Sequence, residues 1–167
     1  VYASQVWAPQ SVDLIRCTER VQRRASKYIL DLPFFCDISY NDRLSTLNLL
    51  PLCYWHEYLD ILFLFKSHHD IINLNSDILP HPQASSQRTR SANLNCLQFQ
   101  TPICKTSTYQ KSYLSRTIRV WNTLSRVLTI NGMLTLKEFR RKLFNYYKTA
   151  LDQCYDVVDP RTWKSVC

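Results

Sequence analysis

The stretch "LCYWHEYLDILFLFK" (residues 52–66) decides the fold that we expect, because it is apolar on nearly every side of a helix. Its polar residues, with one just beyond it, would form only a thin strip: Cys53, His56, Glu57, Asp60 and Ser67. A helix that is apolar nearly all round is covered by its neighbours on most sides. We therefore predict a helix from Leu52 to about Leu74 at the centre of the fold.

The composition around this stretch is that of a folded, helical protein. The chain has 167 residues, of which 46% are apolar and 13% aromatic, enough for one domain with a real core or two small ones. It holds one glycine, Gly132, whereas a β-rich fold needs more turns with positive φ. We predict a mostly α domain of about five helices.

Capping and stop signals divide the chain. A first helix from Asp13 to Leu32 has Ser11 as its cap and ends before Pro33. Other helices are expected over residues 43–49, 108–128 and 135–153, two of them opened by capping boxes at Ser39 and Thr135. The predicted regions are 1–74 (helical), 75–107 (an exposed loop), 108–153 (basic helices) and 154–167 (tail).

The loop region contains one candidate for β structure. Leu97–Gln100 alternates in hydropathy and could form a short strand, with Ile103–Lys105 as its partner in a hairpin near 97–105.

The first helix contains "ERVQRRASKYI" (residues 19–29) and gathers its cations on one side. At about 100° of rotation per residue, these cations fall within roughly a 100° sector: Arg16, Arg20, Arg23, Arg24 and Lys27. The opposite side is the predicted core face, made of Leu14, Cys17, Thr18, Val21, Ala25, Tyr28, Ile29 and Leu32. The cations are either the solvated back of the helix or a contact surface for a polyanion.

The distribution of charge favours the polyanion. The chain carries 21 Lys and Arg against 13 Asp and Glu, a net charge of +8. Residues 81–150 hold twelve of these cations and one anion, whereas residues 33–80 hold two cations and six anions. Basic segments on both sides of an acidic, hydrophobic middle indicate nucleic acid as the partner.

Aromatic residues lie between the cations along the chain. Tyr28 follows Arg23 and Arg24, and Trp121 follows two further candidate contacts, Arg116 and Arg119. The same pattern recurs near the end, where Arg140 and Arg141 precede Phe144, Tyr146 and Tyr147. Cations bind phosphates and planar rings can stack on bases. For Trp121 and Phe144, whose spacing is helical, packing in the core is the favoured alternative.

Signals of catalysis or metal binding are missing. The sequence has no glycine-rich phosphate loop, no Gly-x-Ser-x-Gly and no adjacent acidic pair, so we predict no catalytic residues, no metal site and no cofactor. Glu57 and Asp60 could cooperate as an acid and a base, but a polar seam is the favoured interpretation. The seven cysteines have no zinc-ligand spacing and are interpreted as thiols of a reducing compartment. The longest apolar run is too short to span a membrane, and no membrane partner is expected.

An ordered set of motifs resembles a known family. It comprises "YASQVWAP" (2–9), "ERVQRRASKYI" (19–29), "YNDRLSTLNLLPL" (40–52), "YLDILFLFK" (58–66), "TRS" (89–91), "RVWNTL" (119–124) and "LKEFRRKL" (136–143). Together they resemble the region that follows the polymerase core in reverse transcriptases of non-LTR, LINE-type retrotransposons. The resemblance extends over nearly the whole chain, and the order of the motifs is more specific than any one of them.

The resemblance implies a helical thumb and C-terminal region of an RNA-directed DNA polymerase. Such a region would position an RNA template and DNA primer, or their hybrid, beside an upstream polymerase core that needs Mg²⁺. The parent element would act in the nucleus and cytoplasm. The family's Asp-Asp signature is absent, so its metal-binding aspartates would lie upstream of Val1, and we interpret the chain as a fragment. The rival hypothesis is a stand-alone helical protein-interaction domain derived from such an element.

Overall fold

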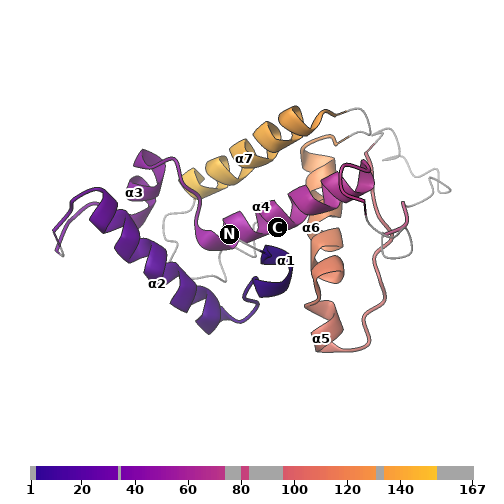
Figure 1. The fold of residues 1–167 in the computed structure, drawn as a ribbon, viewed down its shortest axis with the longest axis horizontal. Coiled ribbons are helices and arrows are strands. Elements are labelled where there is room, and N and C mark those ends of the chain that lie inside the picture. The colour runs from indigo at the N-terminus through magenta and orange to yellow at the C-terminus, as the bar shows by residue number, and fades with distance from the viewer. Residues whose placement is uncertain (1–2, 34, 74–79, 83–95, 131–133, 154–167) are drawn as a thin grey trace. The chain divides into compact units, whose positions relative to one another are not determined.

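The computed structural model describes residues 3–33, 35–73, 80–82, 96–130 and 134–153. Within these ranges the protein is mostly helical, as predicted, with seven helices and no strand (Figure 1). The helices are α1 (Ser4–Trp7), α2 (Val12–Ile29), α3 (Tyr40–Thr46), α4 (Leu52–His68), α5 (Ser107–Gln110), α6 (Tyr113–Val127) and α7 (Leu136–Gln153).

The five predicted helices correspond to α2, α3, α4, α6 and α7, and the predicted caps form. The backbone N–H groups of Leu14 and Asp42 donate to the hydroxyls of Ser11 and Ser39, at 3.4 and 3.1 Å. At α7, Glu138 N–H donates to Thr135 Oγ1 at 3.4 Å, and the Glu138 carboxylate accepts from Thr135 N–H at 3.2 Å. Each cap satisfies a backbone group that the helix leaves without an internal partner.

Several helix bounds differ from the prediction; α3, expected over residues 43–49, spans Tyr40–Thr46. Helix α2 ends at Ile29, and Asp31 then adopts a left-handed conformation, φ 49°, while Leu32 N–H donates to Lys27 O at 3.0 Å. This left-handed ending stops α2 before Pro33 is reached. Helix α4 ends at His68, whereas Leu74 lies outside the described residues. The helix expected from residue 108 is divided into α5 and α6.

The predicted hairpin near 97–105 is wrong, because the backbone of its first half bonds elsewhere. Leu97 N–H donates to Ile130 O at 3.0 Å, and Phe99 N–H donates to Asn122 Oδ1 at 2.9 Å. The described residues of this region contain a single isolated bridge, between Pro82 and Phe99. The backbone groups of Leu97, Phe99 and Gln100 are thus satisfied by α6, by the turn after it and by His81 O, which accepts from Gln100 N–H at 3.1 Å.

The chain divides into two compact units. Unit 1 comprises residues 1–58 and 144–167, and unit 2 comprises residues 59–143. Both boundaries fall inside helices, one in α4 and one in α7. The predicted tail, 154–167, lies outside the described residues, as does most of the loop expected over 75–107.

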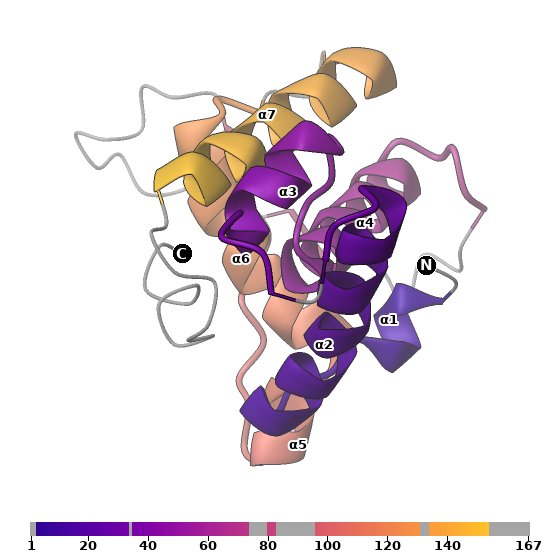
Figure 2. The same cartoon turned by 90° about the vertical axis from the view of Figure 1, so that its left-hand side faces the viewer.

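Unit 1 is built around tyrosines and leucines. Its buried residues include Ile15, Tyr40, Leu44, Leu50, Tyr54, Tyr58, Tyr147 and Leu151. The Tyr54 and Tyr147 rings lie 5.4 Å apart, and Phe144 meets Tyr58 edge-on at 6.3 Å. Helices α2 and α3 lie side by side in this unit (Figures 1 and 2).

Unit 2 has an aromatic core. Trp121 and Phe139 are fully buried, and the Phe65 ring stacks on the Phe139 ring with centroids 4.1 Å apart. Trp121 also donates its indole N–H to Leu97 O at 2.9 Å, which satisfies its one polar group. The interpretation of Trp121 as a core residue is confirmed. Helix α4 has no exposed residue along its length, as its all-round apolar pattern predicts.

Candidate nucleic-acid interface

Helix α2 packs into unit 1 by a side that the sequence did not single out, and the predicted core face is wrong. Its buried residues are Ile15, Glu19 and Ser26. The large members of the predicted core face are exposed instead: Leu14 is 58% exposed, Val21 67%, Tyr28 89% and Ile29 60%. We call these four residues the apolar side of α2.

Glu19 explains why α2 turns its polar side inward. Its carboxylate accepts a hydrogen bond from the Tyr40 hydroxyl of α3 and another from Leu52 N–H, at 3.1 Å, at the start of α4. Burial raises the pKa of Glu19 above its ordinary value, although both hydrogen bonds favour the charged form. Burial and the neighbouring Glu19 also raise the pKa of Tyr40. The carboxylate thus joins three helices of unit 1.

Two further polar contacts hold the same side of α2. Gln22 donates its side-chain N–H to Leu50 O at 2.9 Å, and Arg43 Nε donates to Ser26 Oγ at 3.2 Å. Buried backbone and guanidinium groups are costly without partners, so these pairs fix the rotation of α2 about its axis. The sequence signal was present but weak: Ile15, Glu19, Gln22 and Ser26 recur at the spacing of one helix face.

The predicted row of cations lies next to this buried side. Arg16, Arg20 and Arg24 are exposed, whereas Arg23 and Lys27 are half-buried. The Arg23 guanidinium lies over the Tyr40 ring, 4.6 Å from its centroid, at a cation–π distance. We call these five residues the cationic row. Its three exposed arginines recur every four residues, so one turn of helix separates each from the next.

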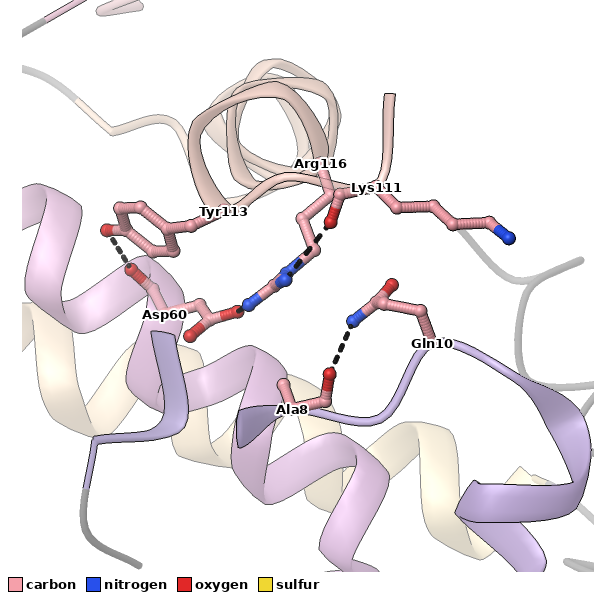
Figure 3. Close-up of polar contacts among 6 residues, drawn as sticks. All are labelled: Ala8, Gln10, Asp60, Lys111, Tyr113 and Arg116. Atoms are coloured by element: carbon pink, nitrogen blue, oxygen red, sulfur yellow. Dashed lines mark hydrogen bonds and ion pairs between the residues drawn. The ribbon is translucent and has the colours of Figure 1, made fainter. Parts of the chain in front are cut away.

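Arg116 differs from the other candidate residues because its charge is paired inside unit 2 (Figure 3). Its Nη2 and Nε atoms donate to Asp60 Oδ2 at 2.7 and 3.1 Å. The side chain of Asp60 is 6% exposed and that of Arg116 is 18% exposed. Breaking such a buried pair is costly, so Arg116 is poorly placed to form an ion pair with a phosphate instead. Asp60 belongs to the polar seam predicted from the sequence.

Tyr113 completes this polar cluster in α6. Its hydroxyl donates to the main-chain oxygen of Asp60 at 3.1 Å (Figure 3). Burial, and after it the Asp60 charge, raises the pKa of Tyr113 well above its ordinary value. The phenol therefore stays neutral and acts as a donor. The cluster links α6 to α4 within unit 2.

The other predicted contacts in unit 2 are exposed. Arg119 lies on α6, with its Nη2 3.6 Å from Cys104 Sγ, and Arg140 and Arg141 lie in the first turns of α7. The structure thus places five candidate cations on one helix of unit 1 and four on two helices of unit 2. Of these nine, Arg116 is held by a buried ion pair and the α2 arginines form the longest regular row.

Metal-ligand groupings and membrane-spanning helices are both missing from the described part of the chain. Those residues contain no group of three or more His, Cys, Asp or Glu side chains that could hold a metal ion. None of the helices in the described ranges is long and apolar enough to cross a membrane. Among the candidate residues that the structure describes, the cationic row is the most regular surface feature.

Comparison with known proteins finds no relative of this chain. No family model, no curated protein and no solved structure matches the chain.

Proposed function

We propose that this chain is a nucleic-acid-binding part of a LINE-type reverse transcriptase, and that it holds template and primer rather than performing chemistry. The cationic row of α2 carries the proposal. Arg16, Arg20 and Arg24 are exposed at a regular spacing, and Glu19 and Gln22 fix the helix that presents them. A rigid row of guanidinium groups suits the regular negative charges of a duplex backbone. The ordered motifs of the sequence point to the same partner.

In the proposed role the contact is electrostatic and reads no sequence. Phosphate contacts position a protein on a duplex, while contacts to base edges specify the sequence. Each phosphate that a cation neutralises releases counterions and adds about 0.9 to the magnitude of the slope of log affinity against log salt concentration on B-DNA. The upstream polymerase core, with its Mg²⁺, would supply the nucleotidyl transfer.

The test replaces the three exposed arginines together. Arg16→Gln, Arg20→Gln and Arg24→Gln keep long side chains that suit a helix, so the fold should survive. Binding of the chain to a short RNA–DNA hybrid is titrated at several salt concentrations. If all three arginines contact phosphate, the slope should flatten by about 2–3.

A matched control removes the same charge elsewhere. Lys105, Lys111 and Arg126 are exposed cations outside the candidate set, and their replacement by glutamine should leave the slope nearly unchanged. An equal change in both triple variants would mean that only net charge matters. If the α2 variant keeps its helical circular dichroism and its salt slope is unchanged, the cationic row does not contact phosphate and is only a solvated surface.

A second candidate function is a helical protein-interaction domain, and the apolar side of α2 favours it. Four large apolar residues exposed along one helix are unusual on a protein that meets only water and phosphate. An upstream reading frame that carries the Asp-Asp motif would support the polymerase proposal. A start codon close to Val1 would support the interaction domain.

A further inference from the structure

Helix α2 presents three different sides, and one of them is not explained by binding to a duplex. One side is buried in unit 1, the second is the cationic row, and the third is the apolar side. Tyr28 is the most exposed residue of the apolar side, at 89%. A large contiguous apolar surface left in water is unfavourable, and such patches mark binding sites.

The cationic row and the apolar side share an edge. Residues four apart on a helix differ by about 40° in direction, so Arg24 and Tyr28 are neighbours on one face. Val21 and Tyr28, seven apart, lie nearly in line along the axis. An occupant of this edge therefore meets guanidinium groups on one flank and a flat, apolar surface with an exposed phenol ring on the other.

The chemistry of that edge fits one occupant best. A duplex keeps the faces of its bases stacked inside and presents mainly phosphates and sugars, so it offers no flat ring face to the Tyr28 side chain. A second copy of the chain would cover the apolar side chains, but an antiparallel pair of α2 helices would bring two cationic rows to the same edge. An unpaired strand offers phosphates and the flat faces of bases together, the combination that single-strand binding surfaces use.

We propose that this edge of α2 binds single-stranded nucleic acid, with Tyr28 stacked on an unpaired base and Arg20 and Arg24 on the flanking phosphates. The inference rests on the proposed function and refines its substrate: a strand beside the duplex, such as unpaired template. The apolar neighbours Val21 and Leu14 extend the surface toward the N-terminus of the helix.

The experiment compares two probes with the full 167-residue chain: a short single-stranded oligonucleotide of uridines and a blunt RNA–DNA duplex. Tyr28→Ala should weaken binding of the single strand by roughly 5- to 150-fold, the loss that corresponds to one stacked base. Binding of the duplex should stay unchanged. The salt slope should also stay unchanged, because a ring releases no counterions. Tyr28→Phe keeps the ring and should retain the affinity.

Tyr109→Ala is the matched control, since Tyr109 is also an exposed tyrosine, 49% exposed, but lies on α5 of unit 2. It should bind both probes as the unsubstituted chain does. Single-strand binding that is unaffected by Tyr28→Ala, or an equal loss on both probes, would overturn the inference while leaving the salt-slope test of the cationic row intact. Failure of the chain to bind either probe would overturn the proposed function as well.

The same variants test the rival occupant. A concentration-dependent dimer in sedimentation velocity that Tyr28→Ala dissociates would assign the apolar side to a second copy and overturn the inference. A monomer at all concentrations is the expected result.

Discussion

Helices α2 and α4 have nearly the same length, 18 and 17 residues, but they use their apolar residues in opposite ways. Helix α4 is apolar all round and no residue of it is exposed. Helix α2 has a distinct apolar side and leaves it in solvent, while a carboxylate and an amide point inward. A helix that is apolar on all sides has to be buried on all sides. An amphipathic helix can be buried by one side or by another. Polar partners on neighbouring segments can decide that choice.

The largest expected effect lies in α4. Phe65 is 1% exposed and its ring stacks on Phe139, so Phe65→Ala removes a ring from a closed core. We expect a loss of about 3–5 kcal/mol in the free energy of unfolding. Urea denaturation followed by circular dichroism measures it. A loss below about 1 kcal/mol would mean that α4 is not the centre of a packed core.

A pair of substitutions on α2 tests which of its sides is inside. Ile15 is 7% exposed and Val21 is 67% exposed, so the same kind of truncation should have different effects. Ile15→Ala should cost about 2–5 kcal/mol of stability, whereas Val21→Ala should stay within about 0.5 kcal/mol. Thermal and urea unfolding of both variants give the comparison. If the two costs are reversed, the apolar side of α2 belongs in the core after all.

The smallest effect is the pH dependence that Glu19 contributes. Because folding raises the pKa of this carboxyl, the folded chain binds more protons than the unfolded chain between the ordinary pKa of 4.5 and the raised value. The stability that Glu19 provides is therefore complete below the ordinary pKa and is lost as the pH rises through the raised one. The loss is at most about 1.4 kcal/mol for each pH unit across that window.

Glu19→Gln isolates this contribution, since glutamine keeps an acceptor oxygen but does not titrate. The stability of the unsubstituted chain relative to Glu19→Gln should fall as the pH rises from about 4 to about 7. Unfolding free energies of both proteins across that range provide the measurement. A difference that grows with pH would show that the hydrogen bonds from Tyr40 and Leu52 outweigh burial.

The sequence by itself determined the helical class, the five longer helices and their caps. These features are local: Ser11, Ser39 and Thr135 bond to backbone groups three residues away, and the apolar pattern of residues 52–66 permits no exposed side. The sequence also determined which cations share a sector of α2, because the direction of each side chain follows from helical rotation alone. In the structure Arg16, Arg20 and Arg24 are exposed, whereas Arg23 and Lys27 are half-buried.

Only the tertiary structure decided which side of α2 is buried, where residues 97–100 find their hydrogen bonds, and that Arg116 is paired with Asp60. Each outcome depends on a partner far along the chain: Leu52 for Glu19, Asn122 for Phe99 and Asp60 for Arg116. The hydrophobic period of a helix or strand depends only on residues that are a few positions apart in the sequence. A buried polar group, by contrast, needs a hydrogen bond to offset the cost of its desolvation. In these three cases the partner comes from a segment that is distant in the sequence and close only in the folded chain.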